Sequence, residues 1–355
     1  MAKHAKDEKS KYLSEPVEPI EPKPDMLVGD LVEAFQYTSY QSRNIARCFN
    51  AYRNMISAPD RPTVFFGFAG AMVPAGMKRV VISMIKNKLI DVLVSTGANL
   101  YHDWHEARGN RHYIGSNQVD DNKLREMFID RIYDTFADEE KFRESDNAIM
   151  KLADSLEPRN YSSREFLEKM GMQVKDTESI LGTAAKNGLP VFCPALNDSS
   201  IGIALTKHYL ESLKANRKPI TIDPIKDNWE IAQIKLKSKS TGVVYVGGGT
   251  PKNYIQQTEV MLEVMGFQTT GHKFAIQMTT DDAKWGGLSG CTFEEAQSWG
   301  KITKDAKMAT AYVDATIALP ILVTALIQKC SDTIAKRRRL RFTWDKAELK
   351  SIQQE

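Results

Sequence analysis

The sequence predicts an α/β protein in which helices cover both faces of a mostly parallel sheet. Short apolar runs rich in β-branched residues alternate with amphipathic segments along most of the chain. Each apolar run ends in Gly, Ala, Ser, Thr, Asn or Asp, which are residues that close strands. With 42% hydrophobic and 26% charged residues among 355, the composition is that of a globular protein. Strands that alternate with helices in this way form parallel sheets buried on both faces.

The expected elements follow in chain order. The run "PTVFFGFAG" (62–70) is apolar and closes with Ala-Gly, so it predicts a strand, and "MKRVVISMIKNKLI" (77–90) has the spacing of an amphipathic helix. The other expected strands are "DVLVSTGAN" (91–99), "LPVFCPAL" (189–196), "KPITID" (218–223), "TGVVYVGGGT" (241–250) and "HKFAIQMTT" (272–280). No internal repeat is present. We therefore predict one large domain, residues 28–335, with a Rossmann-like doubly wound sheet.

The two ends of the chain differ from this domain in composition. Residues 1–27 are charged and proline-rich ("SEPVEPIEPKPD"), which predicts a flexible tail or a strap over a neighbouring subunit. Residues 336–355 form a basic C-terminal extension that begins with "KRRRLRF". Such a run is typical of a solvated face or of the end of a helix.

Composition also excludes several classes of partner. A net charge of +3 is too small to indicate nucleic acid or a membrane surface. The four cysteines are widely spaced without a CxxC pair, so we expect no metal site and a reducing compartment. The N-terminus lacks an apolar signal segment, and the longest apolar stretch, Ile317 to Ile327, is too short to span a bilayer. We expect a cytoplasmic protein.

Small residues dominate the segments at the ends of the strands. These segments are "FAGAMVPAG", "STGANLYHD", "CPALNDSS", "GGGTPKN" and "TTDDAKWGG", and only the last is not rich in them. Ligands of doubly wound sheets bind beyond the carboxyl ends of the strands, and small residues leave backbone amides free to approach a phosphate or ribose. The usual GxGxxG dinucleotide motif is absent. The pattern therefore predicts a nucleotide site of a less common kind.

The stretch "CTFEEAQSWGKITKDAK" (291–307) places a lysine directly after an aromatic residue and a glycine, behind two glutamates. By spacing alone, Glu295 and Trp299 lie at i and i+4 of a helix that packs, with Lys301 exposed. The alternative is a nucleophile in a pocket, because burial lowers the pKa of an ammonium group and favours the reactive neutral amine. An aromatic face also holds a protonated amine, by roughly 0.5–2 kcal/mol.

Across about residues 60–330 the chain resembles the deoxyhypusine synthase family. The resemblance rests on "DVLVSTGAN", "PVFCPALNDSS", "VGGGTPK", "EEAQSWGKI" and "YVDAT", all in the family's order. "STGANLYHD" and the proline-rich start are more similar to the bacterial homologues than to the eukaryotic enzymes.

The resemblance implies a chemistry for Lys301. Members of the family oxidise spermidine with NAD at its secondary amine, and the resulting imine loses 1,3-diaminopropane. A lysine, matched here by Lys301, takes over the aminobutyl group as an enzyme imine. An acceptor amine then captures the group and the hydride returns to it, so that NAD is restored.

Other site residues carry over by position. With Lys301, the catalytic set implied by the resemblance includes Trp299, which dries the site, and Glu295, which anchors a substrate ammonium. The implied NAD contacts are Thr96, Gly97, Asp198, Gly248, Gly249, Thr280, Ser289, Asp314 and Ala315. For each isolated Thr, Ser or Asp, the capping of a turn is the simpler interpretation.

Several family positions are altered. A catalytic histidine is replaced by Asn253, and three acids are replaced by Trp285, Leu288 and Ile203. In the first cofactor loop Ala71 and Pro74 replace an asparagine and a serine, and Tyr101 and His102 replace two acids. Asp281, Asp282, Asp103 or His102 can offer substitute contacts, although loop capping or solvation explains each of them more simply. His102 is also a candidate proton shuttle. His102 and His105 lack a third ligand at metal spacing.

The resemblance therefore implies an aminobutyltransferase of the alkyl-transferring type, with spermidine and a second amine as substrates. The altered recognition residues and the bacterial-like motifs favour putrescine as acceptor, which gives homospermidine, over a lysine of the hypusine-bearing translation factor. A non-catalytic NAD- or polyamine-binding protein is the alternative. The resemblance further implies a homotetramer in which the lysine of one subunit faces the cofactor of its partner.

Overall fold

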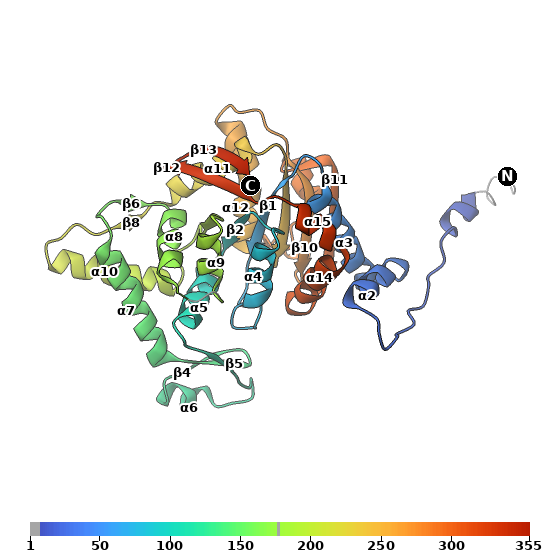
Figure 1. Ribbon diagram of the computed structural model, residues 1–355. Helices are drawn as coiled ribbons and strands as arrows, with labels where there is room; N and C mark the ends of the chain where they lie inside the picture. The colour runs from blue at the N-terminus through green and yellow to red at the C-terminus, as the bar shows by residue number, and fades with distance from the viewer. Residues whose placement is uncertain (1–7, 176–177) are drawn as a thin grey trace.

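A computed structural model describes residues 8–175 and 178–355 and has a central six-stranded sheet (Figure 1). Its strands are β1 (Thr63–Phe68), β2 (Val92–Ser95), β7 (Val191–Phe192), β9 (Thr241–Val246), β10 (His272–Thr279) and β11 (Ile302–Tyr312). All pairs are parallel, and the order is β11-β10-β9-β1-β2-β7. If the six strands are numbered 1 to 6 along the chain and the sheet is followed from β7 to β11, the order is 3-2-1-4-5-6. This is the order of doubly wound dinucleotide folds, and its switch point lies between β1 and β9. The predicted fold class is confirmed.

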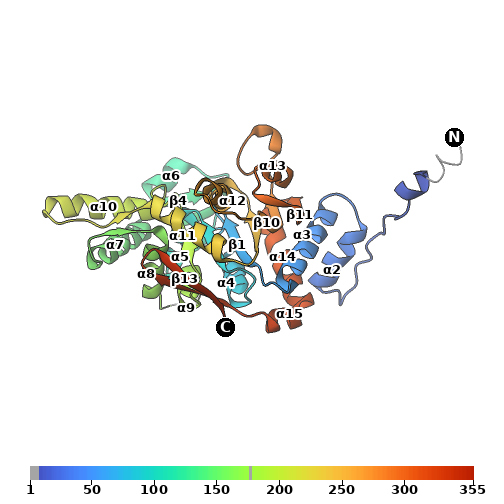
Figure 2. The ribbon, with the colours of Figure 1, turned by 90° about the horizontal axis from the view of Figure 1, so that it is seen from above.

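Both faces of the sheet are covered by helices, as Figure 2 shows for α12 and α13 on one side and α4 and α14 on the other. Alternate strand residues enter two separate apolar cores: Phe66 and Val244 belong to one core, whereas Phe65 and Val243 belong to the other. Every residue of β1, β2 and β9 is buried. The near-continuous apolar character of these runs is explained, since neither face of these strands meets water.

Helices precede, connect and follow these strands. After residue 27 they are α2 (Val28–Ala34), η1 (Phe35–Tyr37), α3 (Tyr40–Ser57), α4 (Lys78–Lys86), α5 (Gly97–Ala107), α6 (Asp121–Glu126), α7 (Glu139–Ser155), α8 (Ser163–Gln173), α9 (Ile180–Lys186), α10 (Ser200–Lys214), α11 (Pro224–Lys237), α12 (Gly249–Val264), η2 (Ala283–Trp285), α13 (Phe293–Ser298), α14 (Ala315–Lys329) and α15 (Ser331–Lys336).

Three features of the sheets differ from the expectation. The run 218–223 yields only β8 (Thr221–Ile222), which pairs with β6 (Asn160–Tyr161) outside the main sheet. The edge strand β11 was not expected, because half-exposed and charged residues interrupt its apolar pattern. A small antiparallel sheet also lies at one end of the molecule (Figure 1), formed by β3 (His112–Ile114), β5 (Thr135–Asp138) and β4 (Ile129–Ile132).

The N-terminal segment runs away from the body of the domain (Figure 1). Its first seven residues lie outside the described part of the chain, and residues 8–19 are exposed. One backbone hydrogen bond, from Glu18 N to Tyr37 O (3.0 Å), joins it to η1. Tail and strap remain the two interpretations of residues 1–27.

The C-terminal residues fold onto the domain. After α15, β12 (Leu340–Asp345) and β13 (Glu348–Gln354) form an antiparallel hairpin. Leu349 is fully buried in the core beneath α11 and α12, and Arg337 of the basic run is also buried. The segment 336–355 is therefore packed against the domain, and its basic run is not a fully solvated face.

A buried charge cluster fastens this C-terminal segment to β1 and β2. Asp91 receives two hydrogen bonds of 2.7 Å from the Arg61 guanidinium and one of 2.9 Å from Val64 N. Arg337 lies 3.7 Å from the same carboxylate and donates to the carbonyl oxygens of Ile56 and Lys88. Arg61 also donates to the carbonyl oxygen of Arg338. The buried charges of Arg61 and Arg337, and the attachment of the C-terminal segment, thus depend on the Asp91 carboxylate.

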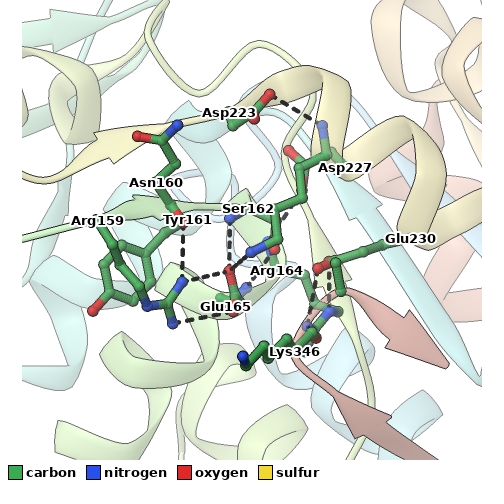
Figure 3. Close-up of polar contacts among 12 residues, drawn as sticks. Arg159, Asn160, Tyr161, Ser162, Arg164, Glu165, Asp223, Asp227, Glu230 and Lys346 are labelled. Carbon is green, nitrogen blue, oxygen red and sulfur yellow. Dashed lines mark hydrogen bonds and ion pairs between the residues drawn. The ribbon is translucent and has the colours of Figure 1, made fainter. Parts of the chain in front are cut away.

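A second network joins α8 to β6 and α11 (Figure 3). Glu165 accepts hydrogen bonds from Arg159 (3.1 and 3.2 Å), from Lys226 (2.5 Å) and from the backbone of Ser162. Burial acts to raise the pKa of Glu165, but the bonds from Arg159 and Lys226 outweigh it and lower the pKa to about 2. Its ionised form is therefore stabilised by the fold.

We expect Glu165 to contribute to acid sensitivity. Because its folded pKa lies below its usual 4.5, the contribution is present above about pH 4.5 and is lost as the pH falls toward 2. The shift corresponds to a free energy of unfolding on the order of 3 kcal/mol. In urea titrations, Glu165→Gln should destabilise the protein at pH 7 and much less near pH 3. An equal loss at both pH values would contradict this assignment.

Candidate active site

The loops at the carboxyl ends of the parallel strands gather the expected cofactor-binding residues, whereas Lys301 directly precedes a strand and lies at the amino ends. Four helices begin at the carboxyl ends as the next element after a strand: α5 after β2, α10 after β7, α12 after β9 and α14 after β11. The start of a helix has backbone N–H groups without partners in the helix and carries the positive end of the helix dipole. The edge is therefore suited to an anionic ligand such as a nucleotide phosphate.

Two of the expected glycines lie where no side chain fits. A Cβ on Gly97 would lie 2.3 Å from the Ser199 Oγ, and a Cβ on Gly248 would lie 2.4 Å from the Ser289 Cα. The Gly249 N–H also donates to the Ser289 Oγ (3.0 Å). These contacts join the turn after β2 to the loop before α10, and the turn after β9 to the loop after β10.

Asn99, which was not among the expected site residues, shapes the loop after β1. Its buried amide oxygen accepts hydrogen bonds from Met72 N (3.0 Å) and Val73 N (3.2 Å), and its Nδ2 donates to Phe68 O (3.4 Å). The signal for it was the "STGAN" motif itself, in which an asparagine side chain mimics backbone in a tight loop.

The loop after β1 lines a cavity of about 630 Å³. Ala71 and Pro74, which replace polar family residues, lie on it together with Asp314 at the start of α14. The small sheet closes the other side through His112 and Thr135. The first cofactor loop and Asp314, far apart in sequence, thus meet at one cavity.

Lys301 lies at a junction between a helix and a strand. Helix α13 ends at Ser298, and two residues later Gly300 has a left-handed φ of +70° that favours glycine. The Lys301 N–H donates to Ala296 O (3.1 Å), and the Lys301 carbonyl accepts from His272 N (2.9 Å), which sets β11 against β10. The Trp-Gly-Lys order is therefore required locally: the glycine reverses the chain so that the lysine comes directly after it.

The three expected catalytic residues lie on α13 and on the turn that follows it. The Lys301 Nζ lies 5.1 Å from the centre of the Trp299 ring. Glu295 stands in the first turn of α13, where Thr292 Oγ1 caps its N–H. Lys301 is partly buried, whereas the Trp299 side chain is 59% exposed. The chain by itself does not exclude water from this aromatic face.

Cys291 connects the catalytic turn to a buried lysine. Burial raises the pKa of the Cys291 thiol, Lys252 and Lys301 act to lower it, and Glu295 acts to raise it. These four side chains are therefore within electrostatic reach of one another. Lys252 was not singled out from the sequence, although it belongs to the "VGGGTPK" motif.

The remaining expected residues lie at the same edge. Thr96, Gly248 and Asp314 occupy the N-cap positions of α5, α12 and α14, and Asp314 accepts a hydrogen bond from Thr316 N (2.7 Å). Asp198 and Thr280 are exposed. The other two are Ser289, which is partly buried, and Ala315, which is buried.

The three aspartates that were expected to substitute for the missing acids lie in different environments. Asp103 is buried and accepts hydrogen bonds from Ile180 N, Leu181 N and Ser179 Oγ, so it caps α9 and does not reach a ligand. Asp282 is engaged with Lys284 (3.0 Å). Asp281 acts electrostatically on Lys252 and is the best placed of them.

His102 is also unsuited to the expected role. Burial and the neighbouring His112 lower the pKa of His102 to about 3, and its Nδ1 lies 2.9 Å from the His112 Nε2. A base with so low a pKa exchanges protons poorly at neutral pH. Among the described residues, no group of three or more His, Cys, Asp or Glu side chains is arranged to hold a metal ion.

The residues at this edge fit a dinucleotide. The Thr96 hydroxyl is buried without a partner at the start of α5. The close approaches at Gly97 and Gly248 keep backbone rather than side chains at the edge. Such positions serve nucleotide phosphates and ribose.

With its doubly wound sheet the chain is an α/β enzyme of the transferase class, and its lysine-bearing turn directly precedes β11, at the amino ends of the strands. The chain belongs to the deoxyhypusine synthase family, whose model matches residues 30–326. Members of this family transfer the aminobutyl group of spermidine.

Similar proteins come from archaea and bacteria. "Probable deoxyhypusine synthase 2" of Methanosarcina acetivorans is 48% identical over 338 residues, which cover 94% of this chain and 95% of that protein. A "deoxyhypusine synthase-like protein" of Elusimicrobium minutum is 39% identical over 305 residues, or 84% and 80% of the two chains. The archaeal protein is thus more similar than this bacterial one, which the motifs did not reveal.

A solved structure has the same fold. The "putative deoxyhypusine synthase" of Entamoeba histolytica superposes with a TM-score of 0.60 over 94% of this chain and all of that one, at 18% identity. Among the described residues, no helix has the length and apolarity needed to cross a bilayer.

Proposed function

We propose that this chain transfers the aminobutyl group of spermidine to an acceptor amine through an imine on Lys301, with NAD as cofactor. The observation that carries the proposal is one short segment in which Lys301 lies beside Trp299, with Glu295 on the helix that leads to it. The family membership supports the same reaction.

Each residue of the turn has a distinct task. Lys301 supplies the amine that attacks the imine carbon and carries the aminobutyl group until the acceptor displaces it. The Trp299 ring attracts the cationic end of the donor, and Glu295 offers the carboxylate that pairs with an ammonium. The turns at Thr96, Gly97, Gly248 and Gly249 would hold NAD, which would supply the group that accepts the hydride and returns it.

We propose a homotetramer in which a partner subunit completes this site. The 59% exposure of the Trp299 side chain supports the idea, as does that of Trp285 at 71%. Attack by a lysine requires a dry surrounding that the chain alone leaves open. A stable, active monomer in sedimentation at micromolar concentration would contradict this proposal.

We propose putrescine as the favoured acceptor, with homospermidine as product. Three acids of the family are replaced by Trp285, Leu288 and Ile203, and all three side chains are exposed at the surface of the chain. Bulk at a subunit contact narrows the entrance and removes charge, which suits a small diamine better than a protein loop. The carboxylates left to fix a diamine are Glu295 and Asp281.

A protein lysine is the second candidate acceptor. The names of the archaeal relatives at 47–48% identity favour it. It would give deoxyhypusine on a translation factor. The exposed surroundings of Trp299 also leave room for a loop in the single chain.

The experiment supplies the pure protein with NAD, spermidine and each acceptor in turn, and identifies the products by mass spectrometry. We expect release of 1,3-diaminopropane and formation of homospermidine with putrescine. Label on the translation factor and none on putrescine would select the second candidate. No product with either acceptor would overturn the transferase proposal for these substrates.

We propose a cytoplasmic location. All four cysteines lie in the described part of the chain and are free. Three of them are buried as thiols, which suits a reducing compartment.

A further inference from the structure

Lys252 is a charged side chain buried directly behind the catalytic turn. It stands in the first turn of α12, is 1% exposed, and ranks among the largest fully buried side chains of the protein. The rings of Tyr245 and Phe293 lie 6.0 and 5.7 Å from its Nζ. Phe293 begins α13, the helix that carries Glu295.

Three oxygens surround the Lys252 ammonium. Its Nζ donates to Gln277 Oε1 (2.8 Å), to the carbonyl oxygen of Cys291, and more weakly to that of Ser289 (3.5 Å). Gln277 in turn donates to the carbonyl oxygens of Gly247 and Ser289, both at 2.8 Å. The pair thereby links the glycine turn after β9 to the segment that leads into α13.

This position is a costly one for a cation. An ammonium at the start of a helix meets the positive end of the helix dipole, and burial removes its hydration. Its three donors match the three oxygens, which offsets part of this cost. An apolar residue of similar length would avoid the cost but would remove the donor to the Cys291 carbonyl and leave that of Ser289 to Gln277 alone.

We infer that Lys252 is a positioning residue that fastens the start of segment 289–301 to the glycine turn of the nucleotide edge and thereby sets where α13 and Lys301 lie. The inference rests on the proposed role of Lys301. Lys252 acts on this segment through the backbone carbonyls of Ser289 and Cys291, to which its ammonium donates. The chain then runs through α13 and the left-handed Gly300 to the nucleophile.

The protonation state of Lys252 decides how firmly the segment is held. Burial lowers the pKa of Lys252 to about 8, while Cys291, Glu295 and Asp281 act to raise it. These three are the titratable groups that act on Lys252. Lys301 acts in turn on Cys291. The Tyr245 hydroxyl stays neutral, because burial raises its pKa well above 10. Above pH 8 the neutral amine has two donors for three oxygens, so the segment loosens.

The first test compares Lys252→Met with Lys235→Met. Lys235 is the control, because it is 5% exposed, donates to Thr241 and Thr270 and pairs with Glu259, but lies at the amino ends of the strands, away from Ser289 and Cys291. Hydrogen exchange is measured by mass spectrometry on peptides that cover 289–295, the part of the segment that begins at the contacts of Lys252. We expect faster exchange there in Lys252→Met and unchanged exchange in Lys235→Met.

The second test measures transfer against pH with Lys252→Arg and Cys291→Ala. A displacement of about 1 Å at the nucleophile costs about a hundredfold, so kcat of Lys252→Met should fall by that order at pH 7. The wild type should lose activity as the pH rises through about 8. Lys252→Arg keeps its charge, so it should restore part of kcat and lack this loss. Cys291→Ala retains the backbone carbonyl to which Lys252 donates, so this variant should still lose activity as the pH rises through about 8.

The outcomes separate the inference from the proposed function. Unchanged exchange at 289–295 in a folded Lys252→Met protein would overturn the inference, as would a loss near pH 8 that persists in Lys252→Arg. Borohydride trapping of labelled spermidine on wild-type Lys301 tests the proposed function alone. Hydrogen exchange does not require turnover. The exchange result can therefore support the inference about Lys252 even if trapping on Lys301 fails, and trapping can succeed even if the exchange is unchanged.

Discussion

Replacing Lys301 by alanine is expected to abolish aminobutyl transfer, with kcat reduced by at least about a thousandfold. The loss of a covalent nucleophile removes a whole step of the reaction rather than one contact. The fold should remain intact, because the Lys301 backbone makes the bonds to Ala296 and His272 and its side chain packs on an exposed ring. Transfer is measured as release of 1,3-diaminopropane, and NAD affinity by fluorescence titration.

Two companion variants sharpen this result. Lys301→Arg should not rescue transfer, because a guanidinium stays protonated and forms no imine. Lys304→Ala, which changes an exposed lysine three residues further on, should be close to wild type. Undiminished transfer in Lys301→Ala would show that another group carries the aminobutyl fragment.

Asp91→Asn is expected to give the largest loss of stability. The change keeps the shape of the side chain but leaves Arg61 and Arg337 buried without a negative partner. Removing one member of a buried ion pair costs about 3–5 kcal/mol in the free energy of unfolding. Burial already lowers the pKa of Arg337 to about 10 although Asp91 acts to raise it, so this arginine depends on the carboxylate. The measurement is the urea midpoint at pH 7.

Asp345→Asn is the matched control. Asp345 also pairs with a cation, Lys350 at 3.5 Å, but its side chain is 64% exposed. A surface pair of this kind contributes about 0–1 kcal/mol. Equal losses in the two variants would mean that the cluster at Asp91 adds nothing beyond an ordinary ion pair.

The sheet was largely predictable because its central strands are apolar on both faces. Runs such as "PTVFFGF" and "TGVVYV" became β1 and β9 as expected. The prediction failed where one side of a strand meets water: β11 carries Lys304 and Asp305 in its exposed half, so its pattern is not that of a buried strand. The run 218–223 looked like a core strand but supplies only two residues to a side sheet.

The site was predictable in part for a related reason. Local motifs brought Glu295, Trp299 and Lys301 into one turn, since i, i+4 spacing and a glycine determine that geometry. The function of Asp103 was not readable, because its partners at the start of α9 lie more than 70 residues away. Lys252 and Asn99 were overlooked because their importance lies in the backbone groups they hold, which only the folded chain brings to them.

The attachment of the C-terminus to β1 also bears on how the protein is made. Arg61 donates to the carbonyl of Arg338 across a separation of 277 residues, and Leu349 fills a core built on strands synthesised much earlier. Contacts this distant in sequence form late, because closing so long a loop is entropically costly. On the ribosome the emerging chain therefore holds Asp91 and Arg61 without Arg337, and the layer beneath α11 stays uncovered until the segment up to Leu349 has emerged. During that interval the nascent chain exposes apolar surface that chaperones bind.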